Sequence, residues 1–143
     1  MSEVLLDANV IVGVLDETDS LNERANALTL RLENEGHQPV FADFLLAEAL
    51  SALCRRAFER KRSSLDLDAI VAWIEEQRER GLVYFPVLTE QTFSEALALV
   101  RSSRGELNFN DARVVVMQRN GEIGDVASFD ADFASIKGFK LIS

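Results

Sequence analysis

The chain has 143 residues, of which 48% are hydrophobic and 27% are charged, and its net charge is −9. This length suits one domain, residues 1–143, with a core of its own, and the composition is typical of a soluble globular protein. No apolar run is long enough to span a bilayer, and Glu3 before the first apolar stretch argues against a secretory signal. With one cysteine, Cys54, and one histidine, His37, neither an internal disulfide nor a zinc site is expected, so we expect a reducing, cytoplasmic setting and no membrane.

Short apolar and β-branched runs alternate along the chain with helical patterns. The opening segment predicts a strand that runs into a helix, and the predicted strands are residues 4–6, 39–42, 83–87, 125–129 and 139–142. Apolar residues at three- and four-residue spacing predict helices over residues 21–32, 43–61, 66–80, 93–100 and 112–119. Predicted helix starts follow the capping residues Ser20, Asp43, Thr89 and Asn108. Strands alternating with helices predict an α/β domain with a mainly parallel sheet.

Four acids fall where such a sheet would bring them to one edge. Ligands bind outside the carboxyl ends of parallel strands, and the helices that follow begin at the same edge. Asp7 and Asp130 each end a predicted strand, Asp111 lies in the first turn of a helix, and Glu48 lies one to two turns into another. Each acid has a structural alternative: Asp7, Asp111 and Asp130 could serve as caps or favour a helix dipole. Glu48 is different, because the apolar segment LLAEALSAL predicts a buried carboxylate that needs a cation.

Clustered carboxylates repel one another unless a divalent cation lies among them. Oxygen-only ligands select hard cations, Mg²⁺ or Mn²⁺, over zinc. Such a site can activate a water and neutralise the charge that develops on a phosphoryl group. The four acids therefore favour a metal-dependent phosphodiester hydrolase. Asp16 is taken as an acid outside the cluster, and Asp16→Asn is expected to affect neither cleavage nor stability.

The segments LLDANV, LLAEALSAL, LNFNDARVVV and ASFDADF, in this order and spacing, resemble the PIN domain, especially the small VapC-type toxins. The resemblance covers essentially the whole chain. It implies a three-layer α/β/α fold in which a five-stranded parallel sheet has the strand order 3-2-1-4-5. It also implies a Mg²⁺- or Mn²⁺-dependent endoribonuclease that acts on RNA, often as a homodimer and often with a cognate antitoxin.

Carried over by position, the resemblance implies catalytic metal ligands at Asp7, Glu48, Asp111 and Asp130. Asn9 and Ser128 match polar residues that orient ligands or water. Asp132 is either a further acid near the metal or only the first-turn acid of a short helix. Apolar helices over residues 21–32 and 69–74 suggest the surfaces for the second copy and the antitoxin.

The basic segment RRAFERKR carries a charge of +4 in an acidic chain. Its cations are either an RNA-facing patch or the solvated end of a helix, where cations are favourable; they are Arg55, Arg56, Arg60, Lys61 and Arg62. Two other functions stay open. One is a non-catalytic PIN-like module that binds RNA or protein. The other is a haloacid-dehalogenase-type phosphatase, which the sequence disfavours because Asn9 cannot supply the proton that this chemistry needs.

Overall fold

A sheet of five parallel strands forms the centre of the molecule, in the order β3-β2-β1-β4-β5. The structure, a computed structural model, describes residues 2–59 and 65–143. The strands are β1 (Ser2–Leu6), β2 (His37–Ala42), β3 (Val83–Tyr84), β4 (Asp125–Ala127) and β5 (Leu141–Ile142). The predicted α/β class and the strand order 3-2-1-4-5 are confirmed. Because β1 and β4 are neighbours, the residues that follow them meet at the carboxyl edge of the sheet.

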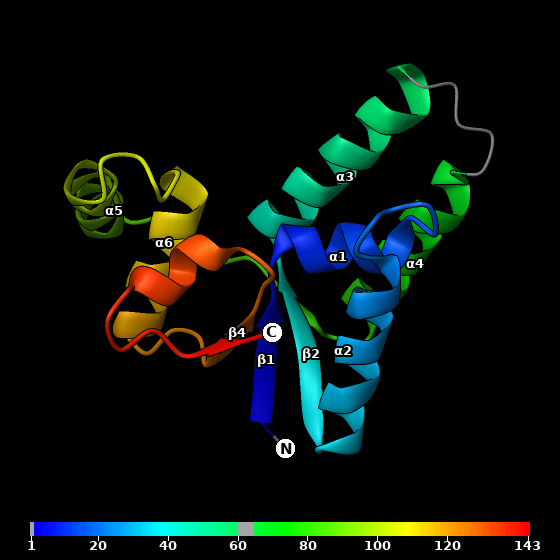
Figure 1. Cartoon of the computed structure of the whole chain (residues 1–143), viewed down its shortest axis with the longest axis horizontal. Coiled ribbons are helices and arrows are strands. Elements are labelled where there is room, and N and C mark those ends of the chain that lie inside the picture. The colour runs from blue at the N-terminus through cyan, green and yellow to red at the C-terminus, as the bar shows by residue number, and fades with distance from the viewer. Residues whose placement is uncertain (1, 60–64) are drawn as a thin grey trace.

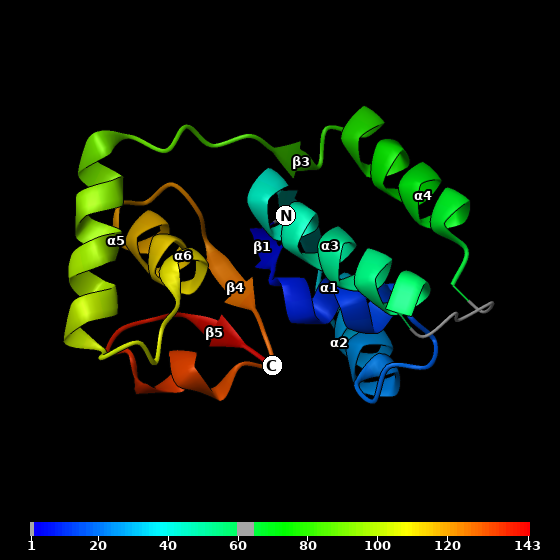
Figure 2. The same cartoon turned by 90° about the horizontal axis from the view of Figure 1, so that it is seen from above.

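Helices cover both faces of the sheet, which gives the predicted three layers (Figure 1). They are α1 (Ala8–Leu15), α2 (Asn22–Asn34), α3 (Asp43–Glu59), α4 (Leu67–Glu79), α5 (Glu90–Ser102) and α6 (Phe109–Arg119), with a short 3₁₀ helix, η1 (Ala131–Ser135). Seen from above, α1 to α4 lie on one side of β1 and β4, and α5 and α6 lie on the other (Figure 2). In the part of the chain described, no helix is long and apolar enough to cross a membrane.

Alternation along the strands divides the core between the two faces. Val4 and Leu6 of β1 pack with the helices α1 to α4, whereas Leu5 packs on the other face with Val114 of α6. A third cluster joins α5, α6 and η1 around the fully buried Phe133. The helix layers therefore hold the sheet rigidly at the edge where the acids gather.

Several predicted boundaries were wrong. The strand predicted over residues 83–87 ends at Tyr84, because Pro86 has no N–H to donate to a neighbouring strand. Ser20 is not the cap of α2, whose capping position is Leu21, and Asp43 is itself the first residue of α3. Thr89 and Asn108 cap α5 and α6 as predicted. Residues 60–64, with part of the predicted 43–61 helix, lie outside the described residues.

The apolar stripe over residues 21–32 belongs to the core rather than to an open surface. Ala25, Leu28 and Leu32 are buried, and on α4 Ile70 is buried as well. Leu30 of α2 and Val71 of α4 are exposed, but most of the other exposed large apolar side chains lie on the loop after β3 and on α5, including Phe85, Val87, Leu88, Phe93 and Leu97. The stripe used to infer partner surfaces therefore stabilises the domain itself.

Candidate active site

Hydrogen bonds through Ser128 join the two acids at the ends of β1 and β4. The backbone N–H of Asp7 donates to the carbonyl of Ala127 at 2.9 Å, which extends the sheet by one residue. The Ser128 hydroxyl donates to Asp7 Oδ2 at 2.6 Å, and it accepts from the backbone N–H of Asp130 at 3.0 Å. One buried serine therefore sets the positions of both acid-bearing segments.

Asn9 completes this network from the first turn of α1. Its side-chain amide donates to Ser128 Oγ at 3.2 Å, and its side-chain oxygen accepts from the backbone N–H of Phe129 at 3.2 Å. Asn9 and Ser128, the two polar residues singled out beside the acids, thus lie in one network with Asp7 and Asp130. They hold the start of α1 against the end of β4.

Two of the four acids cap helices, and Asp111 takes part in the capping of a third from its first turn, so the structural alternative is true of each of the three. Asp7 Oδ1 accepts from the backbone N–H of Ala8 at 2.8 Å, and Asp130 accepts from that of Asp132 at 2.9 Å. The Asn108 side chain caps α6 by accepting from the N–H of Asp111 at 2.9 Å. A backbone hydrogen bond from Asn108 to the Asp111 carboxylate closes a reciprocal box. Capping fixes where these carboxylates lie without removing their charges.

Electrostatic repulsion links all four acids. Burial raises the pKa of Asp111 to about 7, with further contributions from the charges of Asp7, Asp130 and Glu48. Burial also raises the pKa of Asp7, against the lowering effect of the Ser128 hydrogen bond. The pKa of Glu48 is raised by partial burial and by Asp7, and is lowered by a hydrogen bond from Asn110. The sequence places the acids far apart, and the fold makes them neighbours.

Glu48 differs from its prediction. The side chain is exposed rather than buried, since this position of α3 faces the open carboxyl edge instead of the core. Asn110, which donates a hydrogen bond to Glu48, was not singled out in the sequence. Its place beside Asp111 was the only hint in the sequence.

Among residues 2–59 and 65–143, no group of three or more Asp, Glu, His or Cys side chains surrounds a metal position as it stands. The acids are close enough to repel but not drawn together.

Asp132 lies in the first turn of η1 and is exposed. The charge of Asp130 is the main cause that raises the pKa of Asp132. Asp132 is therefore a first-turn acid whose charge interacts with that of Asp130, and a role for it beside a metal stays a prediction.

A groove beside Glu48 has a volume of about 370 Å³ and runs between α1, α3 and the loop before α2. Its lining includes Asn9 and Glu48 at the acidic edge, the small residues Ala49 and Ala52, and Arg56. Small side chains keep the groove open next to the acids. It has room for part of a ligand whose reacting group lies at the carboxylates.

The predicted RNA-facing cations have different environments. Arg55 is exposed, whereas Arg56 Nη1 donates to Asp16 Oδ2 at 2.9 Å and to Asp19 Oδ2 at 2.7 Å. Arg60, Lys61 and Arg62 lie outside the described residues. The patch stays a prediction, and the charge of Arg56 is already matched within the fold.

Asp16 is not the uninvolved acid expected from the sequence. Its side chain is 1% exposed, and it accepts from the backbone and hydroxyl of Thr18 as well as from Arg56. Burial acts to raise the pKa of Asp16, but the hydrogen bonds from Thr18 and Arg56 outweigh it and lower the pKa. These contacts lead us to expect that Asp16→Asn lowers stability, unlike the expectation from the sequence.

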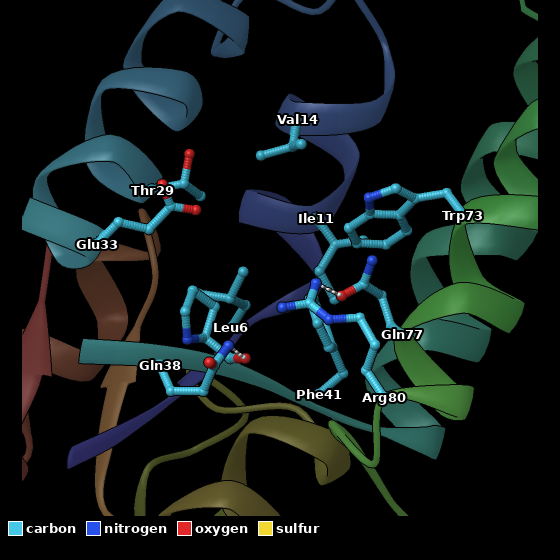
Figure 3. A pocket seen from close by; sticks show the side chains of 11 residues that line it. Leu6, Ile11, Val14, Thr29, Glu33, Gln38, Phe41, Trp73, Gln77 and Arg80 are labelled. Carbon is cyan, nitrogen blue, oxygen red and sulfur yellow. Dashed lines mark hydrogen bonds between the residues drawn. The ribbon is translucent and has the colours of Figure 1, made fainter. Parts of the chain in front are cut away.

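A second cavity, of about 210 Å³, lies between α2, α4 and β2, and none of the four acids lines it (Figure 3). Trp73 and Gln77 of α4 form one wall, and Thr29 and Glu33 of α2 form the opposite wall. Trp73 packs edge-on against Phe41 of β2, with ring centroids 5.3 Å apart. The helices named for partner surfaces thus face each other across an open, partly apolar cavity.

Comparison with known proteins places the fold. No protein-family model and no curated protein sequence matches the chain. Among solved structures, VapC20 of Mycobacterium tuberculosis, a sarcin–ricin loop cleaving toxin, is similar with a TM-score of 0.67 and 23% identity over 95% of each chain. VapBC2 from Rickettsia felis, bound to a DNA fragment from its promoter, has a TM-score of 0.60 and 13% identity over 98% of this chain and 97% of that one.

A toxin–antitoxin complex from Klebsiella pneumoniae has a TM-score of 0.57 and 16% identity over 98% of this chain and 96% of that one. The fold is therefore of the PIN-domain type. More narrowly, it is the fold of VapC20 and of the Klebsiella and Rickettsia structures, matched over nearly the full length of each chain.

Proposed function

We propose that this protein is a metal-dependent endoribonuclease that hydrolyses RNA phosphodiester bonds, and that it is the toxin of a type II toxin–antitoxin pair. The observation that carries the proposal is the convergence of Asp7, Glu48, Asp111 and Asp130 at the carboxyl edge of the sheet, where their charges repel one another. The sarcin–ricin loop cleaving activity of VapC20, which shares the fold, supports RNA as the substrate class.

The residues at this edge fit a hard divalent cation. Their donors are carboxylate oxygens, which suit Mg²⁺ or Mn²⁺ and not zinc. Repulsion among the acids is the strain that a cation would relieve, and the exposed Glu48 can still move towards its neighbours. Asp7, Asp111, Asp130 and Glu48 would hold the ion. When bound, such an ion supplies an activated water and neutralises charge on the phosphoryl group.

The remaining residues position this machinery. Ser128 and Asn9 fix the direction of the Asp7 carboxylate and the start of α1. Asn110 holds Glu48 by a hydrogen bond. The groove bounded by Asn9 and Glu48 offers space for RNA next to the reacting phosphate. Because Ser128 ties the Asp7 carboxylate to the backbone of Asp130, these two acids need little reorganisation before reaction, whereas Glu48 has to move towards them.

The alternatives have less support. A haloacid-dehalogenase-type phosphatase needs a proton donor two residues after Asp7, and Asn9 there is bonded to Ser128 and Phe129. A non-catalytic module would not require four acids at one edge, because their mutual repulsion costs stability.

An antitoxin and a second copy of the chain are the expected protein partners. Two of the similar structures are of toxin–antitoxin systems, which supports an antitoxin. The cavity between α2 and α4 can accept apolar side chains of such a partner against Trp73 (Figure 3). The exposed Phe85 and Val87 supply an apolar surface for a homodimer. Light scattering that detects only monomer at high concentration would remove the homodimer from this proposal.

The test of the activity is RNA cleavage by purified protein in Mg²⁺ or Mn²⁺ and in EDTA. Cleavage is expected with either metal and should vanish in EDTA. Thermal unfolding should shift to higher temperature on addition of Mn²⁺, because the cation relieves the repulsion in the folded state only. Full cleavage in chelator, or absence of cleavage with both metals, contradicts the proposal.

A further inference from the structure

Beside the acids, a cation lies on an aromatic ring. The guanidinium of Arg24, in the first turn of α2, lies over the ring of Phe129 at 4.4 Å from its centroid. Phe129 is the residue between Ser128 and Asp130, and its backbone N–H donates to Asn9. The ring under Arg24 is thus part of the segment that holds the acids.

The backbone beneath Arg24 is firmly anchored to α1. The Asn22 side chain donates to the carbonyl of Gly13 at 2.8 Å. Ala25 is fully buried against Gly13, where an added Cβ would lie only 2.8 Å from the Ala25 Cβ. This close crossing leaves no room for the first turn of α2 to shift, so Arg24 stays at the edge of the site.

Arg24 also differs in its charge environment from three other arginines of the described chain. Arg31, Arg56 and Arg78 each pair with a carboxylate. In the described part of the chain, no ion pair involves Arg24, and Arg24 is exposed. A protein of net charge −9 needs local cations to hold RNA, because phosphates are repelled by the bare acids.

We propose that Arg24 is a substrate-binding residue, which contacts an RNA phosphate that flanks the cleaved bond and is positioned by Phe129. This inference rests on the proposed ribonuclease function and names a contact of the same site. One face of the guanidinium is covered by the ring, which leaves the N–H donors at its edges for phosphate oxygens. A phosphate contact carries no base preference, so Arg24 acts on every RNA sequence alike.

The experiment compares Arg24→Gln with Arg31→Gln. Both remove one positive charge from α2, and they lie two turns, about 10 Å, apart along the helix. Steady-state cleavage of a labelled random-sequence RNA in Mn²⁺ should show KM raised about tenfold by Arg24→Gln, with kcat changed little. Arg31→Gln should leave both unchanged. Arg24→Lys should raise KM less than Arg24→Gln does, because lysine keeps the positive charge but cannot stack a planar guanidinium on the Phe129 ring.

Binding of the same RNA is then measured in the Asp111→Asn background over a series of salt concentrations. Arg24→Gln should reduce the slope of log affinity against log salt by about 0.7, the value for one contact to a single strand. Phe129→Leu should weaken RNA binding when Arg24 is present. It should have little effect when it is combined with Arg24→Gln. A structural role alone would lower the melting temperature and leave KM and the salt slope unchanged.

The outcomes separate this inference from the function on which it rests. If the wild-type protein cleaves RNA while Arg24→Gln has the KM and salt slope of Arg31→Gln, the inference is overturned and the ribonuclease stands. A loss that depends on the base sequence would assign Arg24 to base recognition and overturn the phosphate contact. A wild-type protein that neither cleaves nor binds the RNA overturns both.

Discussion

Helix α1 carries a buried aspartate at each end, and the two have opposite environments. Asp7 caps its N-terminus and Asp16 is the C-terminal capping residue. Asp7 has other acids as neighbours, and burial raises its pKa. Asp16 accepts hydrogen bonds from Thr18 and from the cation Arg56, and its pKa is lowered. At Asp16 the fold supplies the positive charge, and at Asp7 it does not.

This difference teaches how to tell a structural acid from a functional one. An acid at a helix C-terminus is unfavourable to the helix dipole, so Asp16 depends on Arg56 for stability. Asp7 lies at the favourable end and could have been a simple cap, yet its charge interacts with those of Asp111, Asp130 and Glu48. An arrangement of acids that costs stability, with no ion pair to a cation of the described chain, supports the proposed cation from outside.

The largest expected effect is at the N-terminal end of α1, where the acids have no ion pair with a cation of the described residues. Asp7→Asn and Asp111→Asn should each reduce RNA cleavage in Mn²⁺ by at least about 100-fold, because a metal ligand and its charge are lost. Stability in EDTA should be unchanged or slightly higher for Asp111→Asn, since one repelling charge is removed. In Asp7→Asn this gain is offset, because Asn has one acceptor oxygen for the two hydrogen bonds that Asp7 accepts from Ala8 and Ser128. Cleavage rates and thermal unfolding of the same preparations measure both. Glu76→Gln, at an exposed position of α4, is the matched control and should change neither. Near wild-type cleavage by both site variants would make these acids structural.

At the C-terminal end of α1, where Arg56 pairs with Asp16, a substitution should lower stability and leave cleavage unchanged. Asp16→Asn should lower the free energy of unfolding by about 1.5 kcal/mol, because Arg56 loses a buried anionic partner while the Thr18 hydrogen bond is kept. Urea denaturation in EDTA measures this change. Cleavage per folded molecule should be unaffected, and a selective loss of kcat would instead place Asp16 within the site.

The smallest effect is a pH dependence that differs in sign between the two ends. The raised pKa of Asp111, about 7, means that its charged form destabilises the folded protein, so stability in EDTA should rise as the pH falls from 8 towards 5. The lowered pKa of Asp16 acts oppositely: its stabilisation is present above the unfolded value of about 3.9 and is lost as the pH falls through the folded value. Denaturant midpoints measured from pH 8 to below about pH 3 test both. Asp111→Asn should flatten the rise in stability below pH 8 and leave unchanged the loss of stability at low pH that Asp16 causes. A rise that persists in Asp111→Asn would contradict its assignment to Asp111.

Local patterns were sufficient for much of this site. Thr89 and Asn108 were predicted as helix caps because capping involves residues only three positions apart. Asp7 was found because a strand end is visible in the sequence as the point where an apolar run stops. Asp130 was found in the same way, but its predicted place at a strand end was wrong: β4 ends at Ala127, and Asp130 caps η1. The α/β class followed from alternating periodicities, whereas the strand order 3-2-1-4-5 followed from the resemblance to PIN domains. What the sequence by itself determined is thus the class of fold and the acids at its strand ends.

Only the tertiary structure decided how each charge is compensated. Asp16 and Arg56 are 40 residues apart, and Arg24 and Phe129 are 105 residues apart, so no local pattern relates them. Glu48 was expected to be buried because its neighbours in sequence are apolar, but the face of α3 that it occupies depends on how the helix packs on α1. Charges interact through space, and the cost of burying one is set by whatever the fold brings within a few ångströms. That is why the acids were visible in the sequence and their partners were not.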